Sequence, residues 1–174
     1  AGANVNVSDN NGETPLYRAA CHGHSAVVKV LLVTGADIDR VAKDGGTAVH
    51  IATHQGMEKV LHTLLAYSPD VNKVDNCSHS PLFKAVYLGC GEIALALINA
   101  GANLDVPKGR LSLLHVACHR GHLNVVHMLL RAAGGRIDVN GMDGHLRKTP
   151  LLVSVLKGHP DIVKVLIQAG ADVT

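Results

Sequence analysis

Histidine and cysteine residues crowd into one short stretch of the 174-residue sequence, and both residue types can bind metal ions. The stretch HVACHRGHLNVVH contains His115, Cys118, His119, His122 and His127. His115 and His119 are four residues apart, so they would share one face of a helix, as pairs of zinc ligands do. The segment CHGH, which begins at Cys21, raises the same possibility.

Patterns that support catalysis are missing from the sequence. It contains no nucleophile elbow, no phosphate-binding loop and no paired metal-binding carboxylates. The glycine pairs in KDGGT and AAGGR lack the further glycines and the lysine that cradle a phosphate, so they predict turns. We therefore expect neither enzyme activity nor a cofactor within these residues.

The amino-acid composition indicates which classes of partner are not expected and in which cellular compartment the protein is expected. The formal net charge of +2 gives no strong electrostatic case for binding nucleic acid or an acidic membrane. No apolar run reaches the roughly 18 residues that a membrane-spanning helix needs, so direct membrane insertion is not expected. The four cysteines are irregularly spaced, which predicts reduced thiols and an intracellular protein, with the cytoplasm as the expected compartment.

The elements that must position these side chains repeat along the chain. Two segments of the chain have closely similar sequences. The first is TPLYRAACHGHSAVVKVLLVTGAD, which starts at Thr14, and the second is TPLLVSVLKGHPDIVKVLIQAGAD, which starts at Thr149. Intermediate copies start at Thr47, Ser80 and Ser112, so the period is 33 residues with one deletion and four insertions. Each copy has a glycine nine residues after its first position: Gly23, Gly56, Gly89, Gly121 and Gly158.

The repeated residue types predict two helices in each copy. Thr14 and Thr149 suit a helix N-cap, a proline often follows at the first helical position, and the glycine suits a left-handed helix end. A second helix follows, whose apolar positions in the first copy are Val27, Val28, Val30, Leu31 and Leu32. We expect these to share one buried face, with Lys29 on the other. Polar, turn-rich segments between the copies predict protruding loops, and stacking of the copies would bury one continuous core.

The pattern D-x-x-G-x-T-P-L-x-x-A-A-x-x-G-H, followed by V-V-x-x-L-L and G-A-D, resembles the ankyrin repeat. The resemblance covers the whole chain and implies an all-α repeat solenoid, in which each unit is a β-hairpin or loop plus two antiparallel helices. We divide this single domain, residues 1–174, into the tail of a preceding repeat and five repeats: 1–8, then 9–41, 42–74, 75–106, 107–142 and 143–174. Because neither end carries an atypical polar repeat, we expect the chain to be a piece of a longer array in a multidomain protein.

Several positions depart from the ankyrin pattern. The family histidine after T-P-L is kept as His50 and His115, but it is Tyr17, Phe83 and Leu152 in the other copies. The capping hydrogen bonds that this histidine makes are not expected there. Ser68-Pro69 replaces the usual Gly-Ala at the end of a second helix, and the long connector of repeat 4 predicts a bulged loop over 134–147.

The resemblance to the ankyrin repeat also implies a structural position for each histidine of the stretch HVACHRGHLNVVH. His115 falls at the structural position after T-P-L, and His122 falls at the common Gly-His position. His119 is expected to face the groove and His127 the outer side of the second helix. Four converging ligands are therefore not expected, so we predict no metal site here or at CHGH.

Protein binding through a concave groove of loops and first helices is what the resemblance implies. The variable positions on that side are Cys21, His22, His54, Gln55, His79, Tyr87, Leu88, Lys108, Leu111, His119, Arg120, Leu156 and Lys157. Four of these positions carry an apolar residue that the repeat fold does not need: Tyr87, Leu88, Leu111 and Leu156. Basic residues accompany them: Lys108, Arg110, Arg120, Arg147, Lys148 and Lys157. An apolar centre with a basic rim suits a protein or peptide carrying acidic residues, although scattered exposed leucines can also be without function.

The sequence thus predicts a monomeric scaffold or adapter that binds a protein partner. The alternative is a regulatory or substrate-recruiting arm of an enzyme, such as a ubiquitin ligase or kinase, whose catalytic domain lies outside this chain. The resemblance further implies possible asparaginyl hydroxylation at Asn6, Asn72 or Asn140, with Asn72 in the best context. We favour the simpler interpretation that these asparagines stabilise a turn.

Overall fold

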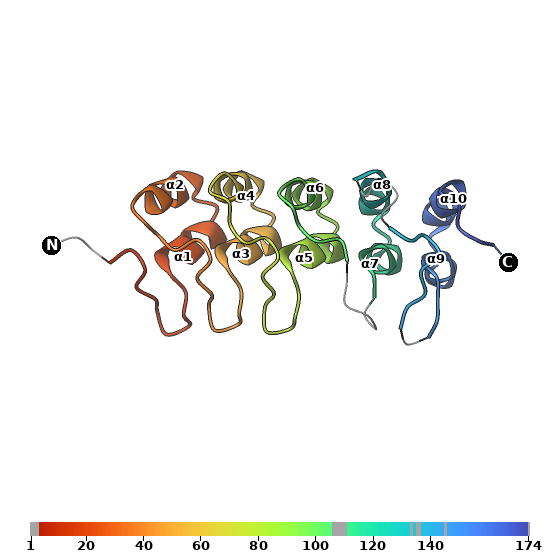
Figure 1. Cartoon of the computed structure of the whole chain (residues 1–174), viewed down its shortest axis with the longest axis horizontal. Helices are drawn as coiled ribbons and strands as arrows, with labels where there is room; N and C mark the ends of the chain where they lie inside the picture. The colour runs from red at the N-terminus through yellow and green to blue at the C-terminus, as the bar shows by residue number, and fades with distance from the viewer. Residues whose placement is uncertain (1–3, 106–110, 133, 135–136, 145, 174) are drawn as a thin grey trace. The chain divides into compact units, whose positions relative to one another are not determined.

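The computed structural model describes residues 4–105, 111–132, 134, 137–144 and 146–173. Over these residues the chain forms ten α-helices and no β-strand (Figure 1). The helices are α1 (Pro15–Cys21), α2 (Ser25–Val33), α3 (Ala48–His54), α4 (Glu58–Leu65), α5 (Pro81–Leu88), α6 (Gly91–Asn99), α7 (Leu113–Arg120), α8 (Leu123–Ala132), α9 (Pro150–Lys157) and α10 (Pro160–Gln168). The all-α fold with two helices in each repeat is therefore confirmed. None of the helices in the described part of the chain is long and apolar enough to cross a membrane.

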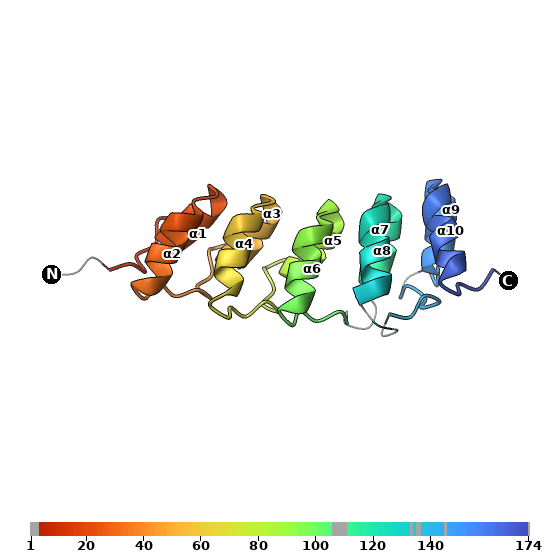
Figure 2. The same ribbon diagram turned by 90° about the horizontal axis from the view of Figure 1, so that it is seen from above.

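The chain divides into two units. Unit 1 comprises Ala1–Ala85 and Asn99–Ala102, and unit 2 comprises Val86–Ile98 and Asn103–Thr174. In unit 1, α1 packs against α2 and α3, while α4 packs against α2 and α3 (Figure 2). In unit 2, α7 packs against α8 and α9, while α10 packs against α8 and α9. Each unit is thus a layer of first helices covered by a layer of second helices.

The first helix of a repeat begins at a side-chain cap and ends at a glycine, as predicted. The Thr14 hydroxyl accepts a hydrogen bond from the Tyr17 N–H at 3.2 Å, and Thr149 caps α9 in the same way. The helices α1, α5 and α9 each begin with proline, whose missing N–H would have no partner in the first turn. At the other end, Gly121 and Gly158 follow α7 and α9 with left-handed φ angles of 76° and 73°.

The second helix α2 differs from the prediction in which of its apolar residues are buried. Val28 and Leu32 are buried, but Val27 and Val30 are about half exposed or more. At 3.6 residues per turn, Val30 lies nearly opposite Leu32, so both cannot face α4. The expectation that all five apolar residues share one buried face was wrong, while Lys29 is exposed as predicted.

His50 and His115 each join their own repeat to the next, and the structure confirms the structural role predicted for this position. His50 is buried, its Nδ1 accepts from the Thr47 N–H at 3.1 Å, and its Nε2 lies 3.2 Å from the His79 carbonyl oxygen. An Nδ1 that accepts leaves the proton on Nε2, so the ring is neutral. Burial lowers the pKa of His50, which keeps it in this form. His115 makes equivalent contacts: its Nδ1 lies 2.7 Å from the Ser112 hydroxyl, as the His50 Nδ1 lies 2.9 Å from the Thr47 hydroxyl, and its Nε2 lies 2.8 Å from the Lys148 carbonyl oxygen.

The residues that replace this histidine have three different environments. Tyr17 is buried, and burial, followed by the nearby negative charges, raises its pKa to about 12. The Phe83 ring stacks on the His79 ring with centroids 4.4 Å apart. Leu152, on α9, is 44% exposed.

Thr53, on α3, carries a buried hydroxyl without a hydrogen-bond partner. Its side chain is 0% exposed, and its Oγ1 is unpaired. The equivalent positions of other copies hold Ala20, Val86 and Cys118, which are buried and apolar. An unsatisfied buried hydroxyl costs about 1 to 3 kcal/mol, so the site suits an apolar residue of the same shape.

We expect Thr53→Val to raise the free energy of unfolding by about 1 kcal/mol, because it removes the unpaired hydroxyl without opening a cavity. Urea unfolding followed by circular dichroism measures this. Thr63→Val is the control and should give no gain, because the Thr63 hydroxyl already donates to the Lys59 carbonyl at 2.8 Å. A lower midpoint for Thr53→Val than for the wild type would contradict the expectation.

Candidate functional site

Three first helices end in exposed residues that lie in unit 2. Tyr87 and Leu88 end α5, His119 and Arg120 end α7, and Leu156 and Lys157 end α9. Together with Leu111, which precedes α7, these seven residues form what we call the unit 2 surface. All seven are exposed. The pairs lie directly before glycines with left-handed backbone, which fixes where each helix stops and leaves its last side chains outside the helix layer.

Tyr87 and Arg120 form the best-defined contact of the unit 2 surface. The Arg120 guanidinium carbon lies 4.3 Å from the centroid of the Tyr87 ring, a cation–π arrangement. The backbone around Tyr87 is held as well. The His122 Nε2 contacts the Tyr87 carbonyl oxygen at 3.1 Å, and the Asn124 side chain donates to the Gly89 carbonyl at 3.2 Å. These contacts hold the aromatic residue in place while its ring stays 44% exposed.

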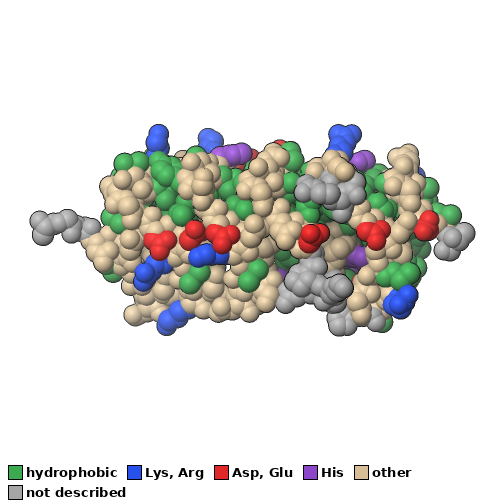
Figure 3. All heavy atoms as spheres, in the orientation of Figure 1, with side chains coloured by type: hydrophobic (Ala, Val, Ile, Leu, Met, Phe, Trp, Pro, Cys, Tyr) green, Lys and Arg blue, Asp and Glu red, His purple; other side chains and the backbone are tan. Residues whose placement is uncertain are grey.

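Positive charge accompanies the apolar residues of this surface. Partial burial, followed by the charges of Lys157 and Arg120, lowers the pKa of His119, so this ring is neutral at pH 7. Arg147 is exposed and Lys148 is half-buried. The predicted basic residues 108 and 110 lie outside the described residues. In Figure 3 acidic side chains lie between the second helices and the loops in each of the two units.

The other predicted partner-binding residues belong to unit 1 and are mostly polar. His22, His54 and Gln55 are exposed at the ends of α1 and α3, whereas Cys21 and His79 are half-buried. The structure therefore places the exposed apolar members of the predicted set in unit 2.

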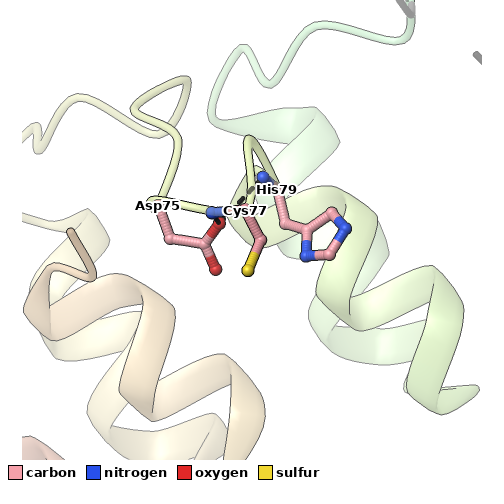
Figure 4. A group of neighbouring side chains, drawn as sticks. All are labelled: Asp75, Cys77 and His79. Atoms are coloured by element: carbon pink, nitrogen blue, oxygen red, sulfur yellow. Dashed lines mark hydrogen bonds between the residues drawn. The ribbon is translucent and has the colours of Figure 1, made fainter. Parts of the chain in front are cut away.

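One cluster of possible metal ligands was missed by the sequence reasoning. Asp75, Cys77 and His79 lie in the loop before α5, and their donor atoms are all within 4.8 Å of one another (Figure 4). The sequence pattern predicts His79 only as a partner contact. The signal in the sequence is the spacing Asp-x-Cys-x-His, which places three donors at alternate positions of one loop.

The histidine-rich stretch 115–127, where no metal site is predicted, is spread over buried and exposed positions of two helices. His115 and Cys118 are buried in α7, whereas His119 and His127 are exposed on α7 and α8. Burial raises the pKa of the Cys118 thiol to about 11, which disfavours the thiolate that binds metals. These positions follow from the roles that the repeat pattern assigns to each residue.

The three asparagines considered for hydroxylation join neighbouring repeats. The Asn6 side chain donates to the Gly35 carbonyl at 3.3 Å and accepts from the Asp37 N–H at 2.8 Å. Asn140 makes the same pair of bonds to Gly170 and Asp172, at 3.4 and 2.8 Å. The Asn72 amide donates to the Gly101 carbonyl at 3.2 Å. We call these contacts the asparagine joints. They support a structural role, and hydroxylation stays a prediction.

Comparisons with known proteins agree with this architecture. A family model for ankyrin repeats in three copies matches residues 32–108 and 82–174, and a second, for many copies, matches residues 1–52. The chain is 29% identical to the B-cell lymphoma 3 protein homolog of Mus musculus over 97% of this chain and 38% of the relative. It is 30% identical to the putative palmitoyltransferase ZDHHC13 of Danio rerio over 99% of this chain and 27% of the relative.

A shorter match covers 53% of the chain and 14% of the ankyrin repeat and SOCS box protein 2 of Bos taurus, at 36% identity. The chain thus spans well under half the length of each of these relatives. Ankyrin repeats are generally protein-interaction modules. With the family models matching nearly the whole sequence and the paired helices repeating as they require, the chain belongs to the ankyrin repeat family.

Proposed function

We propose that this chain is a protein-interaction module whose unit 2 surface binds an intracellular protein or peptide that carries apolar and acidic residues. The observation that supports it most directly is the exposed Tyr87 ring beneath the Arg120 guanidinium. The fold does not demand an aromatic ring there, since other copies hold Cys21, His54 or Leu156 at the equivalent position. Aromatic and arginine residues dominate the binding energy of protein interfaces.

The chemistry of the partner follows from the neighbours of Tyr87. Leu88, Leu111 and Leu156 offer exposed apolar area, which favours an apolar side chain on the partner. Arg120 and Lys157 carry exposed positive charge, which favours nearby carboxylates. In this proposal the chain acts as a monomer, without catalysis, cofactor, nucleic acid or membrane insertion.

A second candidate function has one observation in its favour. A relative named as a putative palmitoyltransferase matches 99% of this chain with only 27% of its own length. The chain could accordingly serve as the recruiting arm of a larger enzyme, with the same surface binding the substrate protein. Sequencing the complete transcript would separate the two candidates: a catalytic domain in the same reading frame supports the second.

The proposal predicts a large effect of Tyr87→Ala on binding. Loss of the ring is expected to weaken binding of the physiological partner by about 2 kcal/mol, or roughly 30-fold. The free energy of unfolding should change by less than about 1 kcal/mol, because the ring is a surface group. A partner would be identified by cross-linking in cells, and the affinity then measured by titration calorimetry with the purified pair.

Two further variants make the test specific. Arg120→Glu should slow association and reduce its dependence on salt concentration, since it removes a charge that attracts the partner. Lys29→Ala on α2 is the control and should bind like the wild type. Equal affinity of wild type and Tyr87→Ala, combined with a loss in Lys29→Ala, would show that the partner binds elsewhere.

A further inference from the structure

The loop before α5 gathers three different metal-binding side chains. Asp75, Cys77 and His79 offer a carboxylate oxygen, a thiol sulfur and an imidazole nitrogen, all within 4.8 Å of one another. In Figure 4 the three side chains project from the same short segment. These are the three donor types that Zn²⁺ takes from proteins. Cys77 is exposed and His79 is half-buried, so an ion can reach the cluster from solvent.

Of the three side chains, only that of Asp75 is needed to form the turn. The Asp75 Oδ1 accepts hydrogen bonds from the N–H groups of Cys77 and His79, both at 2.9 Å, and so closes the turn. The first repeat builds the same turn without sulfur or imidazole. There the Asp9 Oδ1 accepts from the Asn11 and Glu13 N–H groups at 2.8 and 3.0 Å. The turn needs the aspartate, while a cysteine and a histidine at the two alternate positions are additional.

The donors are partly held in place before any ion arrives. The two turn hydrogen bonds fix the Asp75 carboxylate, and the His79 ring lies flat on Phe83 with an interplanar angle of 5°.

A cation already sits beside this carboxylate. The Lys84 Nζ lies 2.9 Å from the Asp75 Oδ2, the oxygen that does not serve the turn. The Lys84 side chain is 21% exposed and long, with several rotatable bonds, so it has a path to solvent when a divalent ion takes its place. The lysine thus competes with a metal ion for the same oxygen, and replacing Lys84 tests whether an ion binds there.

We propose that this loop is a binding site for Zn²⁺ or a similar borderline divalent cation. The ligands are the Cys77 Sγ, one ring nitrogen of His79 and the Asp75 Oδ2, with water completing a tetrahedral shell. Cys77 binds as the thiolate, and its thiol proton passes to the buffer. The Lys84 ammonium leaves the Oδ2, and no electron is transferred.

The test uses the whole 174-residue chain, reduced and freed of metal with a chelator. Cobalt(II) is added first, because a thiolate ligand gives Co²⁺ a charge-transfer absorption in the near ultraviolet. Zinc affinity is then measured by titration calorimetry. We expect one Co²⁺ bound per chain with the thiolate absorption, displaced by Zn²⁺. Absence of the thiolate absorption at saturating Co²⁺ overturns the proposal.

Variants identify the ligands. Cys77→Ser and His79→Asn should each weaken Zn²⁺ binding by more than about tenfold, since even changes next to a metal ligand typically cost 10- to 100-fold. Lys84→Gln should strengthen it by removing the competing cation. Cys90→Ser, in the segment between α5 and α6, is the matched thiol control and should leave the affinity unchanged.

The fold and the site can be distinguished in the same set of proteins. The metal-free Cys77→Ser and His79→Asn variants should keep the helical circular dichroism and melting temperature of the wild type, because repeat 1 forms the same turn without these residues. Zinc should raise the melting temperature of the wild type but not of these variants. Zinc binding that survives both substitutions would place the ion on other histidines and overturn the proposal.

Discussion

Replacing His115 by alanine is expected to lower the free energy of unfolding by about 3 kcal/mol. The ring is 1% exposed and bridges two repeats, with the Ser112 hydroxyl 2.7 Å from Nδ1 and the Lys148 carbonyl 2.8 Å from Nε2. Alanine would remove both of these hydrogen bonds, each worth about 0.5 to 1.5 kcal/mol, although the Lys148 carbonyl would still accept from the Asp143 N–H at 2.9 Å. It would also leave a cavity where the ring was packed, which adds to the loss.

Urea unfolding, followed by circular dichroism, measures this effect. Leu152→Ala is the matched control because Leu152 occupies the same repeat position in α9, where it is 44% exposed. It should cost less than about 1 kcal/mol, as surface substitutions usually do. Similar losses in the two variants would show that the bridge contributes little.

Replacing Gly45 by alanine is expected to cost about 3 kcal/mol, for a different reason. Gly45 has a φ of 78°, where a side chain adds about 1 kcal/mol of strain. A Cβ there would also lie 2.8 Å from the backbone nitrogen of Asn76, in the next loop. That nitrogen donates to the Asp44 carbonyl at 2.9 Å, so relieving the clash would break the contact between the two loops.

Gly56→Ala separates strain from the clash. Gly56 has a φ of 69°, but its Cβ would meet nothing within 4 Å. It should therefore cost only about 1 kcal/mol, the strain of a left-handed alanine. Both variants would be compared by urea unfolding. If Gly45→Ala lost no more stability than Gly56→Ala, the contact between the loops could not be important for stability.

Local signals explain why the fold could be predicted from the sequence. A cap such as Thr14, a proline at the first helical position and a glycine at the end act within one or two turns, and each was found where expected. The phase of the second helix was harder to predict. Val27, Val30 and Leu32 are all apolar, and their different burial depends on which neighbouring helix covers each side.

The candidate site was predictable only in part, because its contacts join different repeats. That Tyr87 would be exposed followed from its repeat position. Its contact with Arg120 depends on how α5 and α7 lie together, which no local pattern encodes. The approach of Asp75, Cys77 and His79 depends on a turn in which Ser78 adopts a left-handed φ of 61°, where the first two loops have glycine. Repeat alignment alone treats such a loop as variable surface.

The asparagine joints have a consequence for how such a chain can evolve. At each joint one repeat supplies a side chain, Asn6 or Asn140, and the next supplies only main-chain groups, at Gly35 and Asp37 or at Gly170 and Asp172. Main-chain groups are the same for nearly every amino acid, so most residues of the receiving repeat can change without losing the joint. Gly35 and Gly170 are the exceptions, because their φ angles of 91° and 90° suit only glycine well. The asparagine codon is thus the side-chain half of each asparagine joint. A repeat copied or exchanged by recombination would find the same main-chain groups for this contact in its new neighbour, which favours changes in the length of the array.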